Sequence, residues 1–192
     1  MTSPPGEPER LRADARKNRE RIVSAAAEAF AREGADATLK DIAQQAGVGI
    51  GTLYRHFPTR EALADAVYRT ETQRLCDAAA ELLQRHAPLD ALREWVLLFL
   101  DYMATKDGMA ESLHAVLTAD ASLRTDTRAR LQDALRLLVD AGQRAGHLRT
   151  PLDPADLSLA LAGLALALRH HPDAPRIAPR LYTLLLDGLR RR

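Results

Sequence analysis

A segment near the N-terminus, residues 39–60, constrains the fold of this chain more than any other part. Its first half has small and aliphatic residues at helical spacing, namely Leu39, Ile42, Ala43 and Ala46. This spacing predicts a short helix with one buried face. Thr38 precedes the helix and Asp41 follows three residues later, a capping-box pattern typical of a helix start. Gly47 suits the left-handed conformation that ends such a helix.

A second helix must follow and must be short, because Phe57-Pro58 stops it. A helix, a glycine-containing turn and a second short helix form a helix-turn-helix, which places its second helix in a DNA major groove. A helical hairpin in a bundle core has the same pattern, so spacing alone leaves both interpretations open. The second helix offers small, hydrogen-bonding and aromatic groups within two turns, namely Gly49, Ile50, Gly51, Thr52, Tyr54, Arg55 and His56. Glycine costs about 1 kcal/mol inside a helix, so two glycines here favour close approach to a phosphate.

The stretch from Thr38 to Leu63 also resembles the DNA-binding domain of the TetR family of bacterial transcriptional repressors. The aromatic pair Tyr54 and Phe57, followed by Thr-Arg-Glu-Ala-Leu, is the most telling part. The resemblance runs from about Arg19 to Leu63, and the rest of the chain resembles the family only in length and helical character.

The resemblance implies how DNA contacts are divided. We expect Ile50, Thr52 and Tyr54 to lie in the groove. We expect phosphate contacts, which position a protein without reading sequence, from Thr38, Arg55, His56 and Arg60. The family commonly has a serine where this chain has Gly49, so a hydroxyl contact to phosphate is missing and the backbone N–H remains.

The first helix is expected to run to Glu33. Its apolar stripe consists of Ile22, Ala26, Ala29 and Phe30, and Gly34 is expected to end it.

The start of this first helix is strongly charged. Arg16 and Lys17, with Arg12 and Arg19, could reach phosphates as N-terminal arms do, or could form an ordinary solvated helix start. Residues 10–60 hold ten Lys and Arg against six Asp and Glu, whereas residues 61–192 hold seventeen against eighteen. A basic N-terminal segment on a near-neutral body fits a nucleic-acid-binding end.

Composition predicts an all-α fold, and the local patterns along the chain divide it into about nine helices. The chain is 46% hydrophobic and 28% charged, which suits a globular protein with a real core. It is poor in β-branched residues and only 4% aromatic, which favours helix over sheet. We expect a disordered lead (1–9), a three-helix DNA-binding domain (10–59) and a ligand-binding and dimerisation domain (60–192).

We expect a cytoplasmic protein. One cysteine, Cys76, allows no internal disulfide and suits a reducing compartment. The polar, proline-rich N-terminus is unlike a signal peptide. The longest apolar run, 159–168, is too short to span a bilayer, so we expect no membrane partner.

Several local patterns divide the second domain into helices. Thr59 is expected to cap a helix from 60 to about 83, which is the connector between DNA and ligand in the TetR family. Lys106 to Gly108 marks a turn, and a short helix follows over 109–117. The polar stretch 118–130 reads as a loop opening into a helix that closes at Gly146. Asp153 and Pro154 then start the next helix.

Three of the eight aromatic residues share one helix face, since Trp95, Phe99 and Tyr102 stand at i, i+4 and i+7. Such a stripe is either core packing or the wall of an apolar ligand cavity. The expected ligand-binding residues are Trp95, Phe99, Tyr102, Met103, His114, Leu117, Leu161 and Leu164. For His114, a core or edge position is the alternative.

The last two helices have more apolar surface than one chain easily covers. We expect them to pair with their symmetry mates in a four-helix homodimer interface containing Leu159, Leu166, Leu181 and Leu185. The alternative is a closely packed monomeric core.

Enzyme signatures are missing from the sequence. It has no glycine-rich phosphate loop after a strand, no Cys/His metal spacing and no nucleophile elbow. His170-His171 beside Asp173 is a weak metal candidate, because adjacent helical residues point in different directions. We therefore expect no catalytic residues, no metal and no cofactor.

These observations predict a repressor that binds a palindromic operator as a dimer and is released by a small hydrophobic molecule. The partners would be double-stranded DNA, an inducer and a second copy of the chain. Two alternatives stay open. One is an activator or ligand-blind regulator whose cavity is filled core, and the other is a helical enzyme or scaffold that has lost DNA binding.

Overall fold

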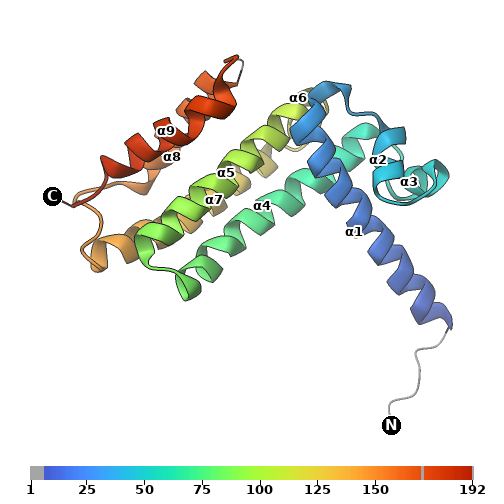
Figure 1. Ribbon diagram of the computed structural model, residues 1–192. Coiled ribbons are helices and arrows are strands. Elements are labelled where there is room, and N and C mark those ends of the chain that lie inside the picture. The colour runs from blue at the N-terminus through green and yellow to red at the C-terminus, as the bar shows by residue number, and fades with distance from the viewer. Residues whose placement is uncertain (1–6, 170, 192) are drawn as a thin grey trace, which may run out of the picture. The chain divides into compact units, whose positions relative to one another are not determined.

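The structure is a computed structural model that describes residues 7–169 and 171–191. The described residues form nine α-helices and one short 3₁₀ helix (Figure 1). This confirms the predicted all-α fold. The first helix begins at Glu7, three residues before its predicted start, so the expected lead is shorter; residues 1–6 of that lead lie outside the described part.

The described chain divides into two compact units. The N-terminal unit contains the chain up to Thr70 together with Thr105–Ala119. Its elements are α1 (Glu7–Glu33), η1 (Gly34–Asp36), α2 (Leu39–Gln45), α3 (Ile50–His56), the first part of α4 (Arg60–Arg85) and α6 (Ala110–Ala119). The division therefore runs through α4, whereas the expected domain boundary stands at the start of that helix.

Helix α1 covers the helix-turn-helix. Its predicted apolar stripe, consisting of Ile22, Ala26, Ala29 and Phe30, is fully buried. It packs against α2, α3 and η1, while α2 also packs on α3. Gly34 follows the helix with a φ of 62°, so a left-handed residue ends α1 as predicted. The three helices thus form the expected domain around one small core.

Local hydrogen bonds define the helix-turn-helix. The Thr38 hydroxyl oxygen accepts from the backbone N–H of Asp41 at 3.1 Å and donates to the Asp41 carboxylate at 2.6 Å. The cap is therefore present, although the carboxylate binds the hydroxyl rather than a free N–H. Gly47, with a φ of 62°, ends α2, and the N–H of Val48 donates to the carbonyl of Ala43.

The C-terminal unit contains Glu71–Ala104 and the chain from Asp120 onward. It holds the rest of α4 and, up to Ala104, α5 (Pro88–Gly108), together with α7 (Ala121–Arg144), α8 (Pro154–Leu168) and α9 (Ala174–Asp187). The Trp95 indole N–H donates to the carbonyl of Leu75 at 2.9 Å, which ties α5 to α4. Arg130 on α7 donates to Gln73 on α4.

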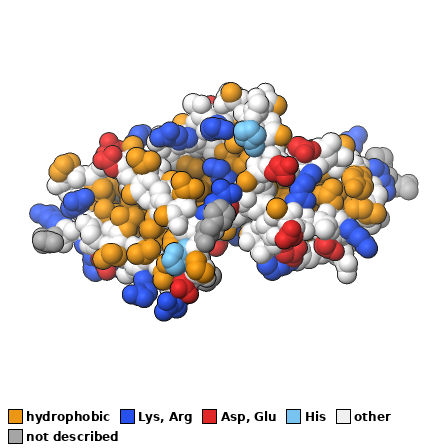
Figure 2. Space-filling view, turned by 90° about the horizontal axis from the view of Figure 1, so that it is seen from above, with side chains coloured by type: hydrophobic (Ala, Val, Ile, Leu, Met, Phe, Trp, Pro, Cys, Tyr) orange, Lys and Arg blue, Asp and Glu red, His pale blue; other side chains and the backbone are white. Residues whose placement is uncertain are grey.

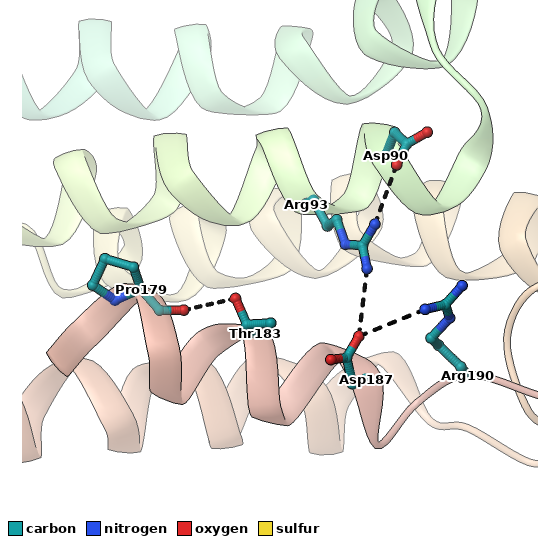
Figure 3. A network of polar contacts seen from close by, with 6 residues as sticks. All are labelled: Asp90, Arg93, Pro179, Thr183, Asp187 and Arg190. Atoms are coloured by element: carbon teal, nitrogen blue, oxygen red, sulfur yellow. Dashed lines mark hydrogen bonds and ion pairs between the residues drawn. The ribbon is translucent and has the colours of Figure 1, made fainter.

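Helix α9 is held at its C-terminal end by an ion-pair network (Figure 3). The Asp187 carboxylate lies 3.4 Å from the guanidinium of Arg93 on α5 and 3.9 Å from that of Arg190. Arg93 also pairs with Asp90 at 3.3 Å, so one guanidinium joins two carboxylates. These side chains are largely exposed, so the network orients α9 more than it stabilises the fold.

Two predicted boundaries in the second half were wrong. The stretch 118–130 is helical from Ala121, because the Asp120 carboxylate caps α7 by accepting from the N–H of Leu123. Leu123 and Thr127, one turn apart, are buried and anchor this charged segment. The predicted turn at 106–108 is helical too, since α5 continues to Gly108.

Other predicted helix starts were confirmed. The Thr59 hydroxyl accepts from the N–H of Ala62 at 3.1 Å at the start of α4. The Asp153 carboxylate accepts from the N–H of Ala155 at 2.8 Å, with Pro154 in the first turn of α8. Both caps use residues within three positions of each other, which is why the sequence pattern finds them.

Candidate functional site

The helix α3 has one buried and one open face. Leu53 is fully buried and Phe57 nearly so, and the Arg19 guanidinium lies over the Phe57 ring, 5.2 Å from its centroid. On the other side, Ile50 is 41% exposed and Tyr54 is 49% exposed. Two large hydrophobic side chains therefore stand in solvent on a helix whose opposite side is already packed.

The glycines before and within α3 leave this surface open. A Cβ atom built on Gly49 or Gly51 would meet no atom within 4 Å. Neither glycine is needed for internal packing, and neither has the left-handed φ of Gly47. Their lack of a side chain therefore leaves room for an external molecule to approach the backbone.

The arginine and lysine side chains expected to bind phosphate on α1 and α3 are exposed, but they differ in their partners within the protein. Lys17 is exposed on α1, and exposed Arg16 is 3.6 Å from the Glu20 carboxylate. Arg55 is exposed but lies along its own helix, where its Nε donates to the carbonyl of Gly51 at 3.2 Å. Surface pairs of this kind are weak, so these side chains can rearrange to meet a phosphate.

Arg60 is placed differently from the other expected contacts. Its guanidinium donates to the backbone carbonyl of Ala37 at 2.5 Å and to that of Ala35 at 3.3 Å. It also lies over the Phe30 ring, 5.1 Å from the centroid. This half-buried side chain joins the start of α4 to the end of α1 and to the loop before α2.

A surface hollow of ≈ 590 Å³ lies beside α3. Its lining includes Thr38 and Lys40 from the start of α2 and Ile50 and Tyr54 from α3. Lys40 is an exposed cation two residues after the expected phosphate contact Thr38, and it is not among the phosphate contacts predicted from the sequence. Its position in the segment 39–60 was the only indication available. His56, the remaining expected contact, is half-buried, as is Thr52.

The aromatic stripe on α5 is confirmed as one buried face. The rings of Trp95 and Phe99 are stacked with centroids 5.8 Å apart, and those of Phe99 and Tyr102 are 6.3 Å apart. The Trp95 N–H donates to the Leu75 carbonyl, and the Thr72 hydroxyl donates to the Tyr102 hydroxyl at 3.5 Å. The indole N–H of Trp95 and the hydroxyl of Tyr102 are thus already engaged within the protein.

The other expected ligand-binding residues are distributed over both units. In the C-terminal unit, Leu161 is buried and Met103 and Leu164 are half-buried. In the N-terminal unit, His114 is exposed on α6 and Leu117 is buried.

Tyr182 on α9 was not singled out from the sequence. Its side chain is 2% exposed, and its hydroxyl has no hydrogen-bond partner among the residues that the structure describes. Burial raises the pKa of this phenol to about 12. No sequence pattern distinguishes this tyrosine from an ordinary core residue, because its isolation depends on the packing around α9.

Helices α8 and α9 expose large leucines. Leu159 is 68% exposed, Leu166 is 66% exposed and Leu184 is 71% exposed. The expected interface residues Leu181 and Leu185 are only half-buried, whereas Leu184, not expected there, points outward. Figure 2 shows hydrophobic side chains gathered over the surface that these two helices form.

The described residues contain neither a cluster of metal ligands nor a membrane-spanning helix. Within 7–169 and 171–191, no three His, Cys, Asp or Glu side chains gather as metal ligands would. His170, part of the weak metal candidate, lies outside this range, and His171 accepts a hydrogen bond from the N–H of Asp173. No described helix has the length and apolar character needed to cross a bilayer.

Comparison with known proteins agrees with this geometry. The family model "Bacterial regulatory proteins, tetR family" matches residues 22–67, and "Transcriptional regulator SbtR-like, C-terminal domain" matches residues 87–191. An HTH-type transcriptional regulator of Staphylococcus aureus is 43% identical over 54 residues, which is 28% of this chain and 29% of that protein. The chain thus spans less than a third of the curated relatives it matches.

Solved structures extend the likeness to most of the chain. A TetR transcriptional regulator of Streptomyces coelicolor is 48% identical, with a TM-score of 0.80 over 90% of this chain and 98% of that one. A TetR regulatory protein of Mycobacterium vanbaalenii is 32% identical, with a TM-score of 0.74 over 94% of this chain and 99% of that one. The chain therefore belongs to the TetR family of bacterial transcriptional regulators, DNA-binding proteins that are not enzymes.

Proposed function

We propose that this regulator is a repressor that binds a palindromic operator as a homodimer and leaves it when a small hydrophobic molecule binds. The observation that carries the DNA-binding half is the open face of α3, with exposed Ile50 and Tyr54 and the side-chain-free backbone of Gly51. An operator lies on the chromosome, so we place the protein in the cytoplasm.

In this proposal, residues 10–59 bind DNA. Ile50, Thr52 and Tyr54 contact base edges, Gly49 and Gly51 allow close approach, and other side chains contact phosphates. Those side chains are Arg16, Lys17, Thr38, Arg55 and His56, to which we add Lys40. We assign Arg60 a supporting role, because its guanidinium is held by two backbone carbonyls.

Residues 60–192 bind the ligand and form the dimer. The exposed leucines of α8 and α9 support a four-helix interface with a second copy. A two-fold dimer would present two α3 helices about 34–36 Å apart, or a multiple of that distance, on successive major grooves.

The ligand would enter between α5 and α8 and favour a shifted position of α4, the helix shared by the two units. The buried aromatic stripe and Leu161 make this region apolar, which supports a hydrophobic ligand. A ligand shifts such an equilibrium only by its difference in affinity for the two states, typically about 1–3 kcal/mol.

The DNA-binding half is tested by selecting bound duplexes from random DNA. We expect enrichment of a palindrome and an affinity that falls steeply with salt, because bound cations release counterions. Absence of any enriched sequence, together with salt-independent binding, would contradict it.

The ligand half is tested by titrating the operator complex with candidate compounds. Trp95 is the only tryptophan in the chain, so its fluorescence reports ligand entry directly. If the inducer lowers the affinity for the operator by some factor, the operator must lower the affinity for the inducer by the same factor. A regulator that binds its operator but responds to no compound would be the ligand-blind alternative.

A further inference from the structure

The chemistry of the open face of α3 narrows the bases that it can read. The exposed fractions of Ile50 and Tyr54 are the largest among hydrophobic side chains of the described helix-turn-helix. They stand four residues apart, so they lie next to each other on one side of the helix. This side therefore presents an apolar strip about one helical turn long.

The side chains that usually read guanine and adenine are scarce on the same helix. Arginine and lysine bind guanine in two-bond contacts, while asparagine and glutamine bind adenine. Helix α3 contains no lysine, asparagine or glutamine, and its one arginine is Arg55. Arg55 donates to the carbonyl of Gly51 at 3.2 Å and to the Thr52 hydroxyl at 3.3 Å, and the proposed function assigns its guanidinium to a phosphate.

Gly51 completes the strip. It lies between Ile50 and Tyr54 in sequence, and a Cβ atom there would meet only open space. A base pair can thus approach the helix backbone and bring its edge against both hydrophobic side chains. In the major groove, the only apolar group on a base edge is the thymine 5-methyl group.

We propose that α3 recognises its operator chiefly through thymine methyl groups held by Ile50 and Tyr54. This inference rests on the proposed DNA-binding function and names the chemistry of its target. Each operator half-site then carries A·T pairs at the positions facing these two residues. Thr52 adds a hydrogen bond to a neighbouring base edge.

Replacement of thymine by deoxyuridine tests this directly, because it removes the methyl group and leaves every hydrogen-bonding atom in place. The operator first comes from selection on random DNA, and each thymine is then replaced in turn. Affinity is measured by fluorescence anisotropy at constant salt. We expect affinity to fall about fourfold for each contacted methyl group that is removed. This is the effect of losing the burial of one group the size of a CH₂.

Protein variants identify the side chain responsible. In the Ile50→Ala or Tyr54→Ala variant, uracil at the facing position should cause no further loss of affinity, because the side chain that contacts the methyl group has been removed. Leu97→Ala is the matched control, because Leu97 is 48% exposed on α5, and it should keep the full sensitivity to uracil. Both α3 side chains are exposed, so their truncation leaves the fold intact.

The possible outcomes separate the two proposals. If a palindrome is enriched but every uracil-substituted operator binds as tightly as the original, the methyl readout is wrong and the DNA-binding function stands. The same holds if sensitivity to uracil persists in both alanine variants. If no duplex is enriched, both proposals fall.

Discussion

At the scale of single residues, Arg60 shows how a side chain of the right type can have a different task from the one its sequence position suggests. An arginine beside a helix-turn-helix is expected to bind phosphate. Here its guanidinium donates to the carbonyls of Ala37 and Ala35 and lies over the ring of Phe30. It thus holds the loop before α2 in place.

Arg60→Gln should therefore lower the free energy of unfolding by about 2 kcal/mol, the usual value of lost hydrogen bonds from a charged group. Urea unfolding measures this. The slope of operator affinity against salt should not change, whereas removal of a phosphate contact reduces it by about one. Arg55→Gln is the control, since exposed Arg55 should alter the salt slope and leave stability unchanged. A reduced slope in Arg60→Gln would show that Arg60 binds phosphate after all.

Tyr182 predicts a pH dependence of stability. Its folded-state pKa of about 12 lies above the ordinary value of 10, so the folded state holds its proton where the unfolded chain loses it. The free energy of unfolding should therefore fall between pH 10 and pH 12, by on the order of 2 kcal/mol. Denaturant unfolding at fixed pH values measures the fall.

Tyr182→Phe should lack this fall. Below pH 9 it should be at least as stable as the wild type, because it deletes an unpaired buried hydroxyl. Thr183→Ala serves as the control, since Thr183 is an exposed, non-ionisable neighbour of Tyr182 on α9 and the pH dependence should stay as in the wild type. Loss of stability in Tyr182→Phe at neutral pH would mean that the hydroxyl has a partner, such as a bound water.

At the scale of elements, the last turn of α1 is where other segments of the N-terminal unit meet. Arg60 reaches Phe30 from the start of α4. Gly108, the last residue of α5, lies so close that a Cβ atom on it would be 1.8 Å from the Phe30 carbonyl oxygen and 3.0 Å from the Cα of Gly34. The close packing of the end of α5 against the end of α1 therefore requires glycine at position 108.

Two glycine variants should have opposite effects. Gly108→Ala should destabilise the protein by about 3 kcal/mol, because the new methyl group collides with a backbone carbonyl that cannot move freely. Gly51→Ala should stabilise it by about 1 kcal/mol, because alanine favours helix and nothing is nearby. Thermal unfolding measures both effects.

Operator binding separates these variants further. Gly51→Ala should lose about tenfold in affinity despite its greater stability, because the methyl group stands between α3 and the bases. Unchanged affinity in this variant would mean that DNA does not approach the backbone at Gly51.

At the scale of the whole molecule, the C-terminal helices expose the apolar surface that a second copy would cover. Leu159 and Leu166 on α8 and Leu184 on α9 are each about two-thirds exposed. Apolar residues gathered on adjacent helices mark an interaction surface more often than a free one. Dimerisation and the operator symmetry would then depend on the same leucines.

The double variant Leu159→Glu with Leu184→Glu should be monomeric, because the proposed interface would have to bury unpaired carboxylates. Light scattering should give 21.1 kDa for this variant and twice that mass for the wild type. Operator affinity should fall by about a hundredfold or more as the two half-sites are no longer bound together. Leu97→Glu, at a leucine that is 48% exposed on α5, is the control and should remain dimeric. A dimeric double variant would place the interface elsewhere.

The sequence alone determined mainly those features that depend on four or five consecutive residues, namely where helices begin and end. The starts of α2, α4 and α8 and the ends of α1 and α2 were predicted from Thr38, Thr59, Asp153, Gly34 and Gly47. Each of these caps is a hydrogen bond or a backbone angle contained within one helical turn. The buried stripe of α5 follows in the same way, since helical periodicity alone brings Trp95 and Phe99 together.

Only the tertiary structure decided which partners the side chains find. Arg60 bonds to residues more than twenty positions away, and the Trp95 N–H to Leu75 twenty positions away. Helix α7 begins in a charged stretch because Leu123 and Thr127 are buried, and Leu184 rather than Leu181 points outward because of how α9 packs. Local hydrogen bonds carry the information for helix ends, whereas contacts between distant segments depend on the packing of all helices at once.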